Sequence, residues 1–159
     1  MPTHAERRQL PYTPEQLYHL VADVARYPEF LPWCRAARIR ERKDNLLVAD
    51  LIIGFKVFRE RFTSRVELDP KAMRIDVTYA EGPFRYLNNH WVFEPAEGGK
   101  ECVIDFYVDF EFRSAMLQKA ISVLFNEAVR RMVAAFEARA HDLYGEPDAP
   151  LALAGTKDG

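Results

Sequence analysis

Residues 103–112 read VIDFYVDFEF, and from Ile104 onward apolar side chains alternate with Asp, Tyr and Glu. A period of two over this length predicts a β-strand with one buried face and one hydrated face. The buried face would carry Ile104, Phe106, Val108, Phe110 and Phe112. Directly afterwards, Ser114 offers an N-cap for a helix that continues to Tyr144, with Gly145 as its natural end. The broad apolar face of this long helix needs a large partner, which a sheet containing the strand would supply.

The same period of two recurs through residues 36–113, where turn signals such as Asp69-Pro70 and Glu97-Gly98-Gly99 separate the apolar runs. This pattern predicts a meander of about six antiparallel strands. A further strand is expected at 4–10, followed by a helix that begins with a capping box from Thr13 to Gln16 and ends at Pro28. The predicted fold class is therefore α+β, with a curved antiparallel sheet wrapped around the long C-terminal helix, the helix-grip arrangement.

The chain has 159 residues, which suits a single domain. We expect this domain to occupy residues 1–145, and residues 146–159, rich in Pro, Ala and Gly, to form a disordered tail. A hydrophobic content of 48% and a net charge of -2 are ordinary for a globular protein and argue against bulk affinity for DNA. An apolar run of the ~20 residues needed to cross a bilayer is missing, as is a secretory signal, so a cytoplasmic location is expected. Two distant cysteines and scattered histidines predict no metal site.

The volume between a strongly curved sheet and a helix need not be filled, and such clefts commonly bind apolar ligands. The alternative is that side chains fill the volume completely. The residues expected to point into it from the strands and the long helix are Phe58, Phe62, Trp91, Phe106, Val108, Leu117, Ile121 and Phe125.

Four blocks of sequence stand out in order along the chain: YPEFLPWC at 27–34, GPFRYLNNHWVFEP at 82–95, DFEFRS at 109–114 and FNEAVRRMVAAFEARAHDLYG at 125–145. Together they resemble the corresponding blocks of the coenzyme Q-binding START-like family, within the wider polyketide cyclase/dehydrase group. The resemblance covers roughly residues 4–145. It implies a small carrier that encloses ubiquinone or its polyprenylated precursors as a bound ligand, with neither a catalytic residue nor a catalytic cofactor.

The resemblance also implies a role for the apolar connection after the first helix. Tyr27, Phe30, Leu31 and Trp33 would cover one end of the cleft; a plain core plug is the alternative interpretation. Eukaryotic members of the family act in mitochondria, whereas this sequence shows no Arg- and Ser-rich transit segment. We therefore expect a bacterial cytoplasmic protein that works peripherally at the inner membrane.

Residues 52–58 read IIGFKVF, which is unusually apolar for a turn between two strands. Such a turn invites a partner, and we expect Phe55 to touch the bilayer while Lys56 lies among the lipid headgroups. A buried turn is the alternative interpretation.

Two sets of arginines alternate with other residues along two predicted strands. Arg38, Arg40 and Arg42 are expected to share one strand face, and Arg59, Arg61 and Arg65 to share another. If these faces adjoin, they would meet anionic lipid or the phosphates of ribosomal RNA; a solvated charged face is the alternative. A bacterial branch of the resembled family is identified as ribosome association toxins, so ribosome binding is the second functional hypothesis.

The alternation in residues 58–68 turns Glu60 inward, between Phe58 and Phe62. An inward carboxyl group could contact a quinone head group, or act as a general acid or base in a polyketide cyclase or aromatase. A cyclase needs paired acid and base groups in the cavity, and Glu60 has no inward partner of this kind. The cyclase hypothesis therefore ranks third.

Overall fold

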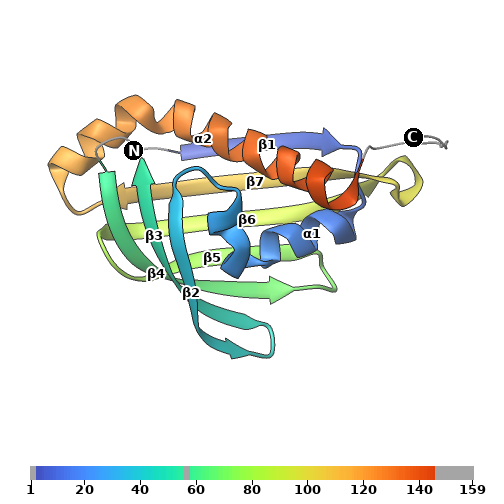
Figure 1. The fold of residues 1–159 in the computed structure, drawn as a ribbon, viewed down its shortest axis with the longest axis horizontal. Coiled ribbons are helices and arrows are strands. Elements are labelled where there is room, and N and C mark those ends of the chain that lie inside the picture. Colours follow the sequence, from blue (N-terminus) through green and yellow to red (C-terminus); the bar gives the residue numbers. More distant parts are fainter. Residues whose placement is uncertain (1–2, 56–57, 146–159) are drawn as a thin grey trace.

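The fold is one seven-stranded antiparallel sheet gripping a long helix, seen in a computed structural model that describes residues 3–55 and 58–145 (Figure 1). The strand order is β1-β7-β6-β5-β4-β3-β2. The strands are β1 (Thr3–Leu10), β2 (Cys34–Lys43), β3 (Leu46–Phe55), β4 (Phe58–Asp69), β5 (Arg74–Glu81), β6 (Phe84–Ala96) and β7 (Glu101–Phe112). The meander β2 to β7 and the α+β helix-grip architecture predicted from alternation are confirmed.

The helix α2 (Ala115–Tyr144) lies across one face of the sheet (Figure 1). Ser114 Oγ accepts a hydrogen bond from the Leu117 amide at 3.2 Å, and the Gly145 amide donates to the His141 carbonyl at 2.8 Å. These two contacts satisfy backbone groups at both ends of the helix, as the sequence predicts. None of the described helices is both long enough and apolar enough to span a membrane.

The connection from β1 to β2 contains α1 (Pro14–Ala22), the 3-10 helix η1 (Val24–Glu29) and the covering segment 30–33. Thr13 and Gln16 form the predicted capping box. The predicted end of the first helix at Pro28 is wrong, because Asp23 leaves helical geometry and Pro28 lies inside η1. The Tyr27 hydroxyl donates to the Val21 carbonyl, so a side chain supplies the hydrogen bond that a further α-helical turn would have made.

The core divides into two apolar clusters beneath α2. The larger joins α1 and η1 to the sheet and includes Leu17, Leu47, Phe93, Trp91 and Phe136. The smaller is a group of four phenylalanines, Phe62, Phe84, Phe110 and Phe112, from β4, β6 and β7. Face-to-edge and stacked rings hold this second cluster together, with Phe84 and Phe112 stacked at 4.8 Å.

Candidate functional site

An apolar cavity of about 250 Å³ lies between the inner face of the sheet and α2. Its walls come from β3 to β7, from α2, and from the α1–η1 segment that covers one end. The volume approaches the lower end of the range of about 300–1,000 Å³ typical of ligand pockets. Side chains therefore do not fill the space between sheet and helix, which contradicts the alternative of complete filling.

Nine of the twelve residues predicted to contact a ligand line this cavity: Tyr27, Leu31, Trp33, Phe62, Trp91, Phe106, Val108, Ile121 and Phe125. Two lie away from it. Phe30 packs against Phe136 at 5.2 Å between ring centroids and lies beneath the Arg139 guanidinium at 5.1 Å. Leu117, in the first turn of α2, packs against the phenylalanine cluster. The side chain of the twelfth, Phe58, lies outside the described residues.

Several lining residues were not among the sequence candidates. Phe110 and Phe112 follow Phe106 and Val108 on the same face of β7, and Met132 and Phe136 continue the apolar stripe of α2. The periods of the strand and of the helix already placed these residues inward. Leu51 and Ile53 of β3 were also missed, although they alternate in the same way.

The covering segment is fixed to α2 by aromatic and ionic contacts. Tyr27 and Phe30 both meet the Phe136 ring edge-on, with centroids 5.7 Å and 5.2 Å away. Arg139 Nη2 donates to Glu29 Oε1 at 2.6 Å, and this hydrogen bond is the main cause that lowers the pKa of the Glu29 carboxyl group. Burial raises the pKa of the Tyr27 hydroxyl well above its usual value, so Tyr27 stays protonated and continues to donate to Val21.

Few polar groups face the cavity, and some of them are already paired. Asn89 Nδ2 donates to the Tyr107 carbonyl at 2.8 Å, and Asn89 Oδ1 accepts from Trp91 Nε1 at 3.2 Å. Glu60 lines the cavity from β4, as alternation predicted. Among the described lining residues, no second carboxylate and no histidine accompanies it. In residues 3–55 and 58–145, no group of three His, Cys, Asp or Glu is arranged to hold a metal.

Most of the arginines predicted to share strand faces lie on the outer face of the sheet, but Arg42 of β2 does not. A bulge between Ile39 and Glu41 inserts an extra residue in β2, so Arg38 pairs with Asp50 while Arg42 pairs with the buried Leu47. The prediction that Arg42 shares a face with Arg38 and Arg40 is therefore wrong.

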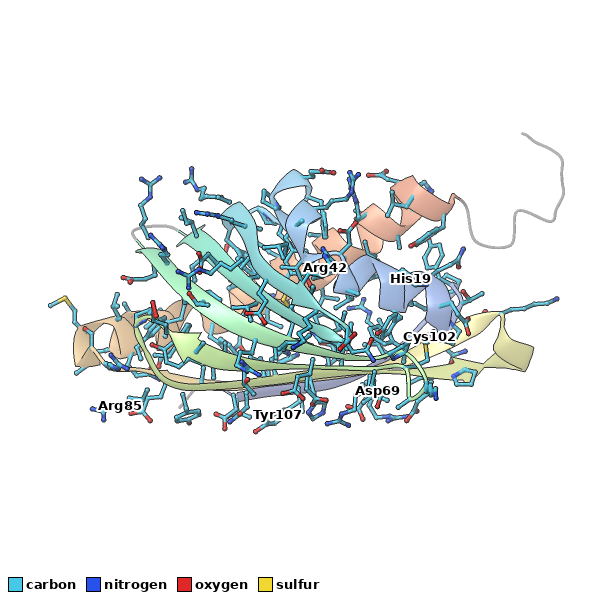
Figure 2. The ribbon with its side chains drawn as sticks, turned by 90° about the horizontal axis from the view of Figure 1, so that it is seen from below. His19, Arg42, Asp69, Arg85, Cys102 and Tyr107 are labelled. Atoms are coloured by element: carbon cyan, nitrogen blue, oxygen red, sulfur yellow. The ribbon has the colours of Figure 1, made fainter. Side chains whose placement is uncertain are left out.

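The second arginine set shares one strand face as predicted, and it meets the first set around Asp50 of the intervening strand β3. Arg59, Arg61 and Arg65 share the outer face of β4, and β3 separates them from β2. On β3, the buried Asp50 accepts from Thr63 Oγ1 at 2.5 Å and lies 3.2 Å from Arg40 Nε and 3.9 Å from Arg61 Nη2. Further along the sheet, Arg85 and Tyr107 project from the same outer face (Figure 2).

The predicted membrane contact falls on a part of the chain that is only partly described. Lys56 and the side chain of Phe55 lie outside the described residues. The flanking strands β3 and β4 stay paired as far as Phe55 and Phe58. Gly54 pairs with Arg59 within this ladder and is therefore not part of the turn. The membrane contact through Phe55 and Lys56 stays a prediction.

A long helix held across a curved sheet above an apolar cavity defines a helix-grip domain of the START-like class. The model of the family described as polyketide cyclase / dehydrase and lipid transport matches residues 10–137. The chain belongs to this family. Because that family includes members of different activity, the individual relatives matter for the finer assignment.

Two curated relatives are similar over nearly the whole chain. The ribosome association toxin RatA of Pseudomonas aeruginosa is 40% identical over 146 residues, which cover 91% of this chain and all of the toxin. The mitochondrial coenzyme Q-binding protein COQ10 homolog B of Xenopus laevis is 36% identical over 154 residues, covering 95% of this chain but 63% of the frog protein. A solved aromatase/cyclase of a Streptomyces species shares the fold, with a TM-score of 0.79 over 95% of this chain and 96% of that one, at 16% identity.

Proposed function

We propose that this protein binds a polyprenyl quinone such as ubiquinone in the cavity beneath α2 and carries it without chemical conversion. The apolar cavity is the observation that carries the proposal. Each CH₂ group that a guest buries there contributes about 0.8 kcal/mol, so an isoprenoid tail gains affinity without specific hydrogen bonds. The similarity to a coenzyme Q-binding protein supports the choice of quinone as the guest.

The carrier would collect and release its guest at the cytoplasmic side of a bacterial inner membrane. The tail is insoluble in water, so transfer requires the cavity to approach the bilayer. The apolar residues 52–58 are the proposed contact. Bacterial relatives support this location.

The two tryptophans of the chain, Trp33 and Trp91, both line the cavity. All indole fluorescence therefore arises beside the proposed site, and a bound quinone should quench it strongly and saturably. Replacing Ala128 by Phe would add bulk to the cavity wall on α2, whereas the same change at the exposed Ala134 would not. We expect saturable quenching in the wild type and Ala134→Phe, and a loss of it in Ala128→Phe.

Organic extraction followed by mass spectrometry of protein purified from a quinone-producing host provides an independent test. Near-stoichiometric ubiquinone in the wild type, and its depletion in Ala128→Phe, would support the carrier function. A lipid-free wild type that also shows linear, unsaturable quenching would refute it.

Ribosome binding is the second candidate, because the similarity to RatA extends over the full length of that toxin. The exposed residues Arg59 and Arg65 make no ion pair among those found in the described part of the chain, so they are available for phosphates. A phosphate-bound complex weakens steeply with salt. Co-sedimentation with large ribosomal subunits at low salt, lost at high salt and in an Arg59→Glu, Arg65→Glu variant, would support this function. Salt-independent or absent co-sedimentation would refute it.

A further inference from the structure

Ser64 of β4 has a buried hydroxyl group without a hydrogen-bond partner. Its exposed fraction is 1%, it lines the cavity, and its Oγ is one of four buried side-chain atoms left unpaired in the described residues. Buried polar groups are paired in the great majority of cases, because leaving one unpaired is costly. Because Ser64 lines the cavity, a guest bound there could supply the missing partner.

The neighbours of Ser64 within the sheet cannot provide that partner. Ser64 pairs across the ladder with Ala49 of β3 and with Tyr79 of β5. Ala49 has no polar side-chain atom, and the Tyr79 hydroxyl donates to the Gly82 carbonyl and makes no hydrogen bond with Ser64 Oγ. Of the other polar groups that line the cavity, Asn89 is held by Tyr107 and Trp91, whereas Trp33 Nε1 is, like Ser64 Oγ, a buried donor without a partner.

The position of Ser64 is set by an irregularity in the sheet. The register between β4 and β5 shifts between Thr63 and Ser64, which pair with Glu81 and Tyr79 respectively. Thr63 and Ser64 face opposite sides of the sheet, yet both are buried, with Thr63 bonded to Asp50. Bulges of this kind commonly redirect a side chain near a functional site.

We propose that Ser64 is the specificity-determining contact for the head group, donating its hydroxyl proton to a quinone carbonyl oxygen. This inference rests on the proposed quinone-binding function. A quinone carbonyl oxygen is an acceptor without a proton of its own, and the isoprenoid tail offers no polar atom, so only the head group complements Ser64. Because Ser64 is buried, a head group that it contacts lies inside the cavity.

The experiment compares two guests that differ in their polar groups. Decylubiquinone carries carbonyl oxygens, whereas decylbenzene has a similar tail and a ring without them. Dissociation constants for both are measured by displacement of a fluorescent apolar probe from the wild type and from Ser64→Ala. The matched control is Ser122→Ala, an exposed serine on α2 whose hydroxyl donates to the Gln118 carbonyl.

Ser64→Ala should weaken decylubiquinone binding by about three- to tenfold, the worth of one net hydrogen bond. Its affinity for decylbenzene should stay unchanged, as should both affinities of Ser122→Ala. The melting temperature of ligand-free Ser64→Ala should not fall, because the hydroxyl has no partner to lose. A merely structural serine would instead lower the melting temperature and affect both guests equally.

Two results would overturn the inference, and they differ in what they say about the proposed function. If the wild type and Ser64→Ala bind decylubiquinone equally, the head group is not held by Ser64, while quinone binding itself stands. If the wild type binds decylbenzene but not decylubiquinone, both the quinone function and the role of Ser64 fail.

Discussion

Replacing Gly82 by alanine should destabilise the protein through a contact that can be located to single atoms. Gly82 lies in the turn between β5 and β6, with φ at +141°. A Cβ atom there would lie 2.6 Å from Phe62 Cβ, 2.9 Å from Phe62 Cα and 3.0 Å from the Arg61 carbonyl oxygen. Two of these three atoms belong to the backbone of β4, so a side-chain rotation cannot relieve the clash.

The magnitude follows from two separate costs. A residue other than glycine in this region of backbone conformation costs about 1–3 kcal/mol. Overpacking against well-packed neighbours costs about another 1–3 kcal/mol. The sum of about 2–6 kcal/mol is a large share of the roughly 5–15 kcal/mol that stabilises an ordinary domain.

Gly98→Ala is the matched control. Gly98 also has a positive φ, at +69°, but nothing lies within 4 Å of where its Cβ would be. It should lose only about 1–2 kcal/mol from the backbone conformation alone. Urea unfolding followed by tryptophan fluorescence gives both free energies of unfolding. Equal losses in Gly82→Ala and Gly98→Ala would show that the close approach to Phe62 does not matter and would refute the reasoning.

Three further perturbations test other parts of the structure. Asp50→Ala should lower the free energy of unfolding in urea by about 2 kcal/mol, because the buried carboxylate accepts a hydrogen bond from a neighbouring hydroxyl, and an unchanged value would contradict this. Burial raises the pKa of Cys34 to about 11 and of Cys102 to about 12, above the 9.0 of a free thiol, so the folded state keeps its thiol protons while the unfolded chain loses them. Stability should therefore fall as pH rises from 9 towards 12, and replacing both cysteines by alanine should flatten the fall in urea unfolding at stepped pH. Glu29→Gln removes the charged partner of Arg139 and should speed the release of bound ubiquinone in stopped-flow quenching, whereas an unchanged rate would mean that η1 does not move for release.

Local patterns in the sequence predicted most of the architecture, because each depended on neighbouring residues. The alternation in VIDFYVDFEF gives β7, and Ser114 and Gly145 bound α2. The bulge in β2 was not predictable in this way, because no glycine or proline near Arg40 marks it. One extra residue there reverses the face of Arg42, and a strictly alternating prediction must fail beyond it.

The sequence predicted which side chains face the cavity, but it did not predict that a space remains between them. Alternation shows which side chains point inward, yet the curvature of the sheet decides whether they meet α2 or leave a gap. Leu117 points inward but lies against the phenylalanine cluster, and Phe30 packs on Phe136 outside the cavity. The Ser64 hydroxyl is unpaired because neither of its neighbours across the sheet, Ala49 and Tyr79, forms a hydrogen bond with it. The sequence of β4 alone does not show which residues these neighbours are.

The two candidate functions use opposite faces of one sheet, and this separates them experimentally. A quinone would occupy the inner face, whereas ribosomal phosphates would meet Arg59 and Arg65 on the outer face. Ala128→Phe should therefore abolish quinone quenching while leaving ribosome co-sedimentation unchanged, and the double Arg→Glu variant should do the reverse. If Ala128→Phe removed both activities while the protein stayed folded, the occupied cavity would have to influence the outer face. The sheet itself would be the physical link, because two consecutive residues of β4 face its two sides. Ser64 faces the cavity, and Thr63 faces the outer side, where it donates a hydrogen bond to Asp50.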